Sequence, residues 1–161
     1  MIFFDPTAAM LRFIVQQAGK NPVYDIGSGQ GHLVRLLMAK KCKVLGIEPM
    51  WAYLESFDPR LPVLPKEAQR VDILRTHPGL CIFARPCHSG FVEEVIKLIH
   101  PGSRILYIGL ERNLSTDLPS YVDTPQLKQV SRCLGKSGER IFEILRKVSH
   151  GKDVKVKTGP V

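Results

Sequence analysis

The sequence has no long apolar run and no clustered cysteines. None of its apolar stretches approaches the ~20 residues that a helix needs to cross a bilayer, which argues against a membrane-spanning protein. The four cysteines form no Cys-x-x-Cys pair, so we expect buried thiols and neither a metal site nor a redox motif. No basic stretch precedes an apolar one at the start, so we expect no secretion signal and place the protein in the cytoplasm.

The composition is that of a chain that can bury a core. Apolar residues make up 44% of the 161 residues and charged residues 24%, which argues against disorder and against a disulfide-stapled miniprotein. The length suits a single domain. We expect this domain to occupy residues 1–150, with a basic C-terminal tail over 151–161.

Acidic residues are scarce toward the C-terminal end. Lys and Arg number 23 against 15 Asp and Glu, a net charge of +8, and residues 126–161 hold +6 of it. Such an asymmetry fits a nucleic-acid or other acidic partner, because cations near phosphates release counterions, but it also fits a solvated face with a loose tail. Almost no aromatic residue interleaves with these charges, so we expect at most weak, salt-sensitive nucleic-acid contact through this region.

Strand-like apolar runs alternate with helix-length segments along most of the chain. Strands separated in this way need crossover connections, which produce a parallel sheet with helices on both faces. The predicted fold is therefore an α/β three-layer sandwich. We expect strands at residues 22–27, 42–48, 61–64, 80–84 and 103–109, and helices at 5–18, 33–41, from 50, at 66–75 and from 89.

Capping residues and turns set the expected ends of these elements. Asp5 before Pro6 is expected to cap the first helix and Gly19 to end it, while Ser89 is expected to cap the last helix. Residues 111–125 look like a loop. The turn at 135–138 could join two strands or two short helices, and we favour a β-hairpin with arms at 130–134 and 140–145.

The most informative segment is the glycine loop Asp25–Gly31, where the first strand meets its helix. Gly27, Gly29 and Gly31 let the backbone turn sharply and let a flat or charged ligand approach closely. Their G-x-G-x-G spacing is not the dinucleotide fingerprint G-x-G-x-x-G, and no P-loop Lys-Ser/Thr pair follows. Glu48 ends the next strand 19 residues after Gly29, near the distance expected for an acid that binds a ribose diol. The alternative is a tight turn that binds nothing.

Asp25–Gly31 together with Gly46-Ile47-Glu48 resembles the cofactor site of the class I S-adenosylmethionine-dependent methyltransferases. The pattern extends over about residues 23–147, and it implies a mostly parallel Rossmann-like sheet that ends in an antiparallel hairpin. By this resemblance S-adenosylmethionine is the cofactor, Asp25 orients its amino-acid end and Glu48 holds its ribose hydroxyls. By the same resemblance Gly27, Ser28, Gly29 and Gly31 line the path of the cofactor, and Pro49 and Met50 flank its adenine. Glu67 contacts the adenine amino group, and Ala84, which ends the fourth strand, completes the set.

Catalysis is expected beyond the end of the fourth strand, at residues 84–89, because ligands of open parallel sheets collect at the carboxyl ends of the strands. His88 is the candidate base for an acceptor that must lose a proton, unless it simply starts a helix in solvent. Arg85 could hold an acidic acceptor or pair with a nearby carboxylate. The Asn/Asp-Pro-Pro-aromatic motif of amino-methylating relatives is absent here, which weakens the case for their substrates.

Three functions are compatible with these patterns. The first is a small methyltransferase of unknown acceptor that lacks a lid domain. The second is a catalytically inactive methyltransferase-like protein that binds a cofactor or a partner. The third, a different Rossmann-type binder such as a nicotinamide enzyme, is disfavoured by the glycine spacing.

Overall fold

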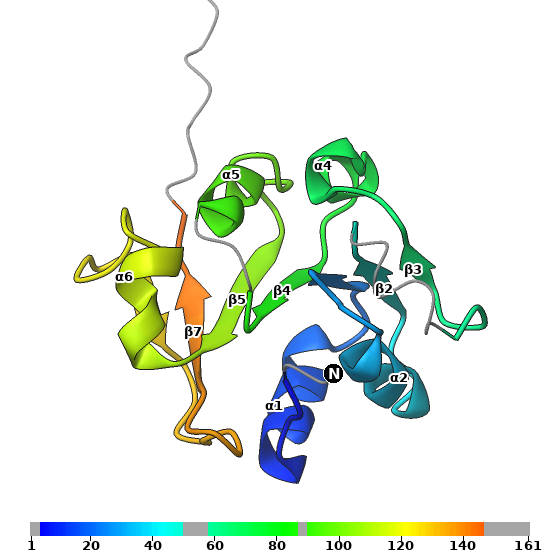
Figure 1. Cartoon of the computed structure of the whole chain (residues 1–161), viewed down its shortest axis with the longest axis horizontal. Coiled ribbons are helices and arrows are strands. Elements are labelled where there is room, and N and C mark those ends of the chain that lie inside the picture. The colour runs from blue at the N-terminus through cyan, green and yellow to red at the C-terminus, as the bar shows by residue number, and fades with distance from the viewer. Residues whose placement is uncertain (1–3, 50–57, 87–89, 147–161) are drawn as a thin grey trace, which may run out of the picture.

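In the computed structural model a mixed β-sheet carries helices on both faces (Figure 1). The structure describes residues 4–49, 58–86 and 90–146. Within these ranges the strands are β1 (Val23–Ile26), β2 (Val44–Ile47), β3 (Val63–Leu64), β4 (Leu80–Ala84), β5 (Arg104–Gly109), β6 (Leu127–Gln129) and β7 (Arg140–Ile144). The helices are α1 (Ala8–Ala18), α2 (His32–Ala39), α4 (Ile73–Thr76), α5 (Phe91–Ile96) and α6 (Leu114–Asp117), with 3₁₀ turns η1 (Ala68–Arg70) and η2 (Glu111–Asn113).

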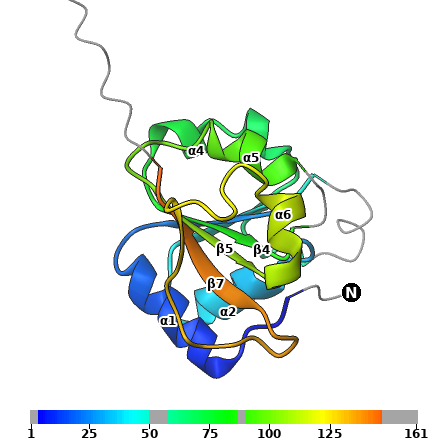
Figure 2. The ribbon, with the colours of Figure 1, turned by 90° about the vertical axis from the view of Figure 1, so that its left-hand side faces the viewer.

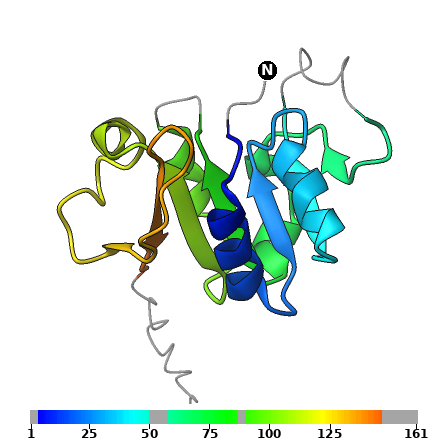
Figure 3. The same cartoon turned by 90° about the horizontal axis from the view of Figure 1, so that it is seen from below.

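The strand order is β3-β2-β1-β4-β5-β7-β6. The first five strands are parallel, and β7 lies antiparallel between β5 and β6. The order reverses between β1 and β4, which is where ligands of such sheets bind. The predicted α/β fold with its antiparallel end is confirmed. The carboxyl ends of the parallel strands form one edge of the sheet, the upper edge in Figure 3, and we call it the carboxyl edge.

Side chains alternate between two cores because successive strand residues point to opposite faces. Val23 and Ile82 pack with α1 and α2 on one face, whereas Tyr24 and Phe83 pack with α4, α5 and α6 on the other (Figure 2). Among the described residues no helix is both long and apolar enough to cross a membrane.

The first helix begins later than predicted. Its N-cap is Thr7, whose hydroxyl accepts a hydrogen bond from the Met10 backbone N–H at 3.2 Å. Asp5 does not cap the helix, because its carboxylate is bonded instead to His32 Nε2 at 2.8 Å and to Lys136 Nζ. The predicted end at Gly19 is confirmed, with φ at 55°.

Several other boundaries needed tertiary information. The predicted helix 66–75 is divided into η1 and α4, and the first part of the predicted loop 111–125 folds as η2 and α6. The hairpin forms, but its first arm is β6 at 127–129 and not 130–134. α5 is capped by Gly90. The predicted cap Ser89, the helix from residue 50 and the tail 151–161 lie outside the described residues.

Candidate cofactor site

The glycine loop follows β1 at the carboxyl edge. Gly27, Gly29 and Gly31 have φ of 79°, 55° and 83°, in the left-handed region that only glycine adopts without strain. The N–H groups of Gly27 and Ser28 both donate to the Ile47 carbonyl, at 2.8 and 3.1 Å, which ties the loop to the end of β2. The alternating glycines are therefore required by the backbone path.

Glu48 closes this loop from the neighbouring strand. The Gly29 N–H donates to Glu48 Oε2 at 2.9 Å, so the two parts of the predicted cofactor motif are in direct contact. The Glu48 side chain is buried, and so is that of Asp25, which stands at the end of β1. Burial, and secondly the charge of Glu48, raise the pKa of the Asp25 carboxyl to about 7.

The chemistry of this acid pair fits a cationic ligand. Two carboxyl groups in a low-dielectric site repel each other when both are charged, and a positive group beside them offsets that cost. S-adenosylmethionine carries a sulfonium and an ammonium group. An added Cβ at Gly29 would meet no atom within 4 Å, so the loop leaves open space on that side.

Ser28 serves the packing of the loop. Its hydroxyl oxygen is buried with no hydrogen-bond partner in the described part of the chain. It lies against Gly46, where an added Cβ would come within 2.8 Å of it and within 2.9 Å of a Val34 methyl. Glycine at position 46 is thus needed so that β2 and the loop can approach each other.

The other predicted cofactor residues that the structure describes follow strands at the same edge. Pro49 follows Glu48, and Ala84 ends β4; both are partly buried. The Glu67 side chain is exposed and lies 3.4 Å from the guanidinium of Arg70. Met50 lies outside the described residues. Roles for all of these residues in cofactor binding stay predictions.

The end of β4 holds Arg85 in an unusual conformation. Its φ is 50°, its N–H donates to the Ile108 carbonyl at 2.8 Å, and its guanidinium donates to Glu139 Oε1 at 3.0 Å. The buried Glu139 also accepts from the Ser137 N–H at 2.9 Å. Of the two predicted possibilities for Arg85, the structure shows the pairing with a carboxylate. His88, the candidate base, lies outside the described residues.

A second polar group at this edge was not predicted. The Tyr107 hydroxyl on β5 donates to Asp117 Oδ2 on α6 at 2.5 Å, and both side chains are buried. Burial raises the pKa of both groups, while the charge of Arg85 acts in the opposite direction. Tyr107 reads as one more apolar strand residue and Asp117 falls in the predicted loop, so no local signal reveals the pair.

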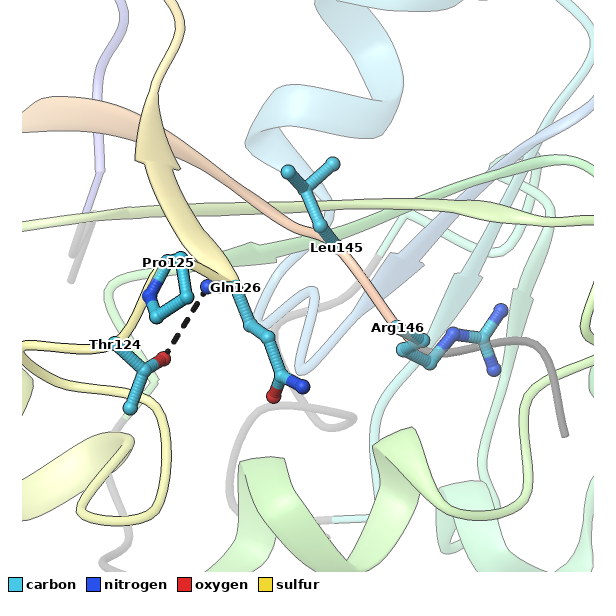
Figure 4. Close-up of a pocket in the computed structure, with 5 residues that line it drawn as sticks. All are labelled: Thr124, Pro125, Gln126, Leu145 and Arg146. Atoms are coloured by element: carbon cyan, nitrogen blue, oxygen red, sulfur yellow. Dashed lines mark hydrogen bonds between the residues drawn. The ribbon is translucent and has the colours of Figure 1, made fainter.

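An open cavity of about 450 Å³ lies at the other end of the sheet (Figure 4). Residues Thr124 to Gln126, which precede β6, and Leu145 and Arg146, which follow β7, line it. None of the predicted site residues does. This cavity is therefore separate from the glycine loop.

Comparison with known proteins identifies the fold. No protein-family model matches the chain, and no curated protein matches its sequence. The 23S rRNA methyltransferase ErmE matches 89% of this chain and 70% of its own at 16% identity, with a TM-score of 0.59. A TehB-like SAM-dependent methyltransferase from Corynebacterium glutamicum matches 85% of this chain and 86% of its own, at 13% identity and with a TM-score of 0.57. An rRNA methylase from Streptococcus thermophilus matches 91% of this chain and 99% of its own, at 13% identity and with a TM-score of 0.55.

The chain has the fold of the class I, Rossmann-like methyltransferases. At such low identities the likeness shows the fold and no more, and it confirms the fold that the glycine loop and Glu48 implied. The chain spans about half of the length of several other structures that it matches, namely 47%, 50% and 51% of them.

Proposed function

We propose that the protein is an S-adenosylmethionine-dependent methyltransferase. The observation that carries the proposal is the bond between Gly29 and Glu48, which ties the glycine loop after β1 to the end of β2 and sets two buried acids, Glu48 and Asp25, at the carboxyl edge. Such an edge is where open parallel sheets bind nucleotides. The matched fold and the cationic character that the acid pair favours support the same cofactor.

The bound cofactor supplies a methyl group on a positively charged sulfonium, which is already a good donor. In this proposal Asp25 holds the cofactor ammonium group, and Glu48 accepts hydrogen bonds from the ribose hydroxyls. Pro49 and Met50 flank the adenine and Glu67 contacts its amino group. The backbone of the glycine loop lines the path of the cofactor at Gly27, Ser28, Gly29 and Gly31. Ala84 borders the cofactor at the end of β4.

The acceptor end involves Arg85 and His88. The Arg85–Glu139 pair ties the chain at the end of β4 to the turn before β7, and in this proposal Arg85 thereby positions the acceptor end of the site. His88 is proposed to take the proton from an acceptor that must lose one. Methyl transfer otherwise needs in-line approach in a site that excludes water.

Nucleic acid is the acceptor class that the charge favours. Two of the matched structures are rRNA methyltransferases by name, and this chain carries +8. The weak nucleic-acid contact predicted through residues 126–161 is part of this proposal. Arg146 does not contribute to it, because its guanidinium binds backbone carbonyls and is not available to phosphate.

A catalytically inactive, cofactor-binding or partner-binding protein is the second candidate. The absence of the Asn/Asp-Pro-Pro-aromatic motif and the engagement of Arg85 by Glu139 favour it. Cofactor binding without turnover on any acceptor pool would distinguish it from an active enzyme.

Calorimetric titration tests the cofactor proposal. S-adenosylmethionine and S-adenosylhomocysteine are expected to bind and NAD is not. Glu48→Ala should weaken binding of both ligands by about 1 to 3 kcal/mol, because a charged hydrogen bond to the ribose is lost. Glu94→Ala, which removes an exposed acid on α5, is the matched control and should leave affinity unchanged. Tight binding of NAD alone would refute the proposal.

A further inference from the structure

The edge of the sheet opposite the glycine loop carries four lysines: Lys20, Lys40, Lys41 and Lys43. Lys20 follows the end of α1, and the other three lie between the end of α2 and the start of β2. The Val23 N–H donates to the Lys43 carbonyl at 2.8 Å and so joins the two segments. This is the lower edge in Figure 3, where the parallel strands begin. We call these four residues the lysine edge.

Few acids accompany the lysine edge. Residues 1–47 contain six Lys and Arg but only two acids, Asp5 and Asp25. Asp25 is buried at the carboxyl edge, and Asp5 is bonded to His32 and Lys136. All four lysines are exposed, and within the described ranges none of them forms an ion pair. Their charges are therefore not neutralised by neighbouring side chains.

Lys41 occupies a backbone position that favours glycine. The N–H of Lys41 donates to the Met38 carbonyl at 2.8 Å, and that of Cys42 donates to the Leu37 carbonyl at 3.0 Å. These two bonds define a Schellman helix end with Lys41 in the left-handed position, at φ 62°. The residue of positive φ that ends α1 is a glycine, Gly19. A lysine at this position strains the backbone, and such strain is typical of residues retained for a function.

The helix dipole explains only part of this arrangement. Cations at the C-terminal end of a helix interact favourably with its partial negative charge, which accounts for Lys20 and Lys40. It does not account for Lys43, which immediately precedes β2. Nor does it account for Lys41, where glycine would remove the strain while Lys40 kept the favourable charge.

We propose that the lysine edge binds the phosphate backbone of RNA and tethers the protein to it, separately from the cofactor site. Ammonium groups act as point charges toward phosphate, and such contacts fix position without reading sequence. RNA fits better than an anionic membrane because, over α2 and the two segments that carry the four lysines, Met38 is the one large exposed apolar side chain. The inference does not rest on methyl transfer, since RNA binding can be measured without cofactor.

Anisotropy of a fluorescent RNA stem-loop, titrated between about 50 and 200 mM salt, tests the proposal. Lys40→Gln/Lys41→Gln/Lys43→Gln should lower affinity at low salt at least tenfold and reduce the slope of log K against log salt by about 2 to 3. The control Arg12→Gln/Lys97→Gln/Arg112→Gln removes the same charge from exposed positions elsewhere and should lose far less. Equal losses in the two variants would show attraction by net charge alone and overturn the proposal. Binding to phosphatidylserine vesicles without binding to RNA would also overturn it.

Lys41→Gly provides a second, independent test. Relief of the left-handed strain should raise the Tm, while loss of one phosphate contact should weaken RNA binding a few-fold and lower the salt slope by about 1. The two effects have opposite signs, so a change in folding cannot mimic the loss of binding. Unchanged RNA affinity in this variant would remove Lys41 from the surface and contradict the argument from strain.

Discussion

Asp25→Asn is expected to raise the free energy of unfolding near pH 8 and to flatten its pH dependence. The pKa of the Asp25 carboxyl is raised from 3.8 to about 7 by burial and by the neighbouring Glu48. At 1.36 kcal/mol for each pKa unit, the penalty for keeping this group ionised in the folded protein has an upper value of about 4 kcal/mol. Asparagine has a similar shape without the charge and avoids this penalty.

The sign of the pH dependence follows from proton linkage. A carboxyl whose pKa is raised on folding binds its proton more tightly in the folded state than in the unfolded state. Its cost is therefore absent below pH 3.8, grows between pH 3.8 and about 7, and is fully present above that window. Wild-type stability should lose this contribution as the pH rises, and the Asn variant should not.

Denaturant unfolding at several values of pH from about 5 to 8 checks this expectation. Glu67→Gln, at an exposed acid beside Arg70, is the control and should run parallel to the wild type. The Asn variant should also bind S-adenosylmethionine more weakly, since Asp25 is proposed to hold its ammonium group. Higher stability with weaker binding would mark Asp25 as a site residue kept at the expense of stability. A variant less stable than the wild type at pH 8 would contradict the argument.

Elements with strong local signals could be predicted from the sequence. The all-apolar run Leu80–Ala84 is β4 at the predicted residues, and the glycine loop adopts the left-handed conformations that its spacing requires. The segment 66–75 could not be resolved in this way, because its split into η1 and α4 depends on how Ala68, Val71 and Leu74 pack into the core. The first arm of the hairpin was placed too late, because its register depends on pairing with β7.

The same distinction applies to the site. Asp25 and Glu48 are recognisable because a fixed spacing connects them to the glycine loop, and the structure places that loop in contact with Glu48. Tyr107 on β5 meets Asp117 on α6, and Arg85 after β4 meets Glu139 just before β7, only in the folded protein. Basic residues are the most misleading class, since sequence alone does not distinguish an exposed lysine from a half-buried arginine that binds backbone carbonyls.

Arg146 is that half-buried arginine, and Arg146→Ala is expected to destabilise the protein strongly. Its guanidinium donates to the carbonyls of Ile99 and His100, both at 2.7 Å, and of Ser103 at 3.1 Å. These carbonyls lie beyond the C-terminal end of α5 and in the turn before β5, so the side chain fastens the end of β7 to both elements. Without it several partly buried acceptors lose their donors, and the expected loss is about 2 to 4 kcal/mol.

Arg104→Ala is the matched control because Arg104 is also near the end of the sheet, but its half-exposed guanidinium binds the side chains of Glu143 and Gln17, both at 2.7 Å, in place of backbone carbonyls. Its loss should cost less than about 1 kcal/mol. Arg146→Lys should fall between the two, since an ammonium group keeps the charge but cannot reach all the carbonyls that the planar guanidinium bridges. In thermal unfolding the Ala variant at position 146 should lose roughly 10 °C in Tm. Equal stability of the two Ala variants would show that water replaces the guanidinium at little cost, and that the end of α5 does not depend on Arg146.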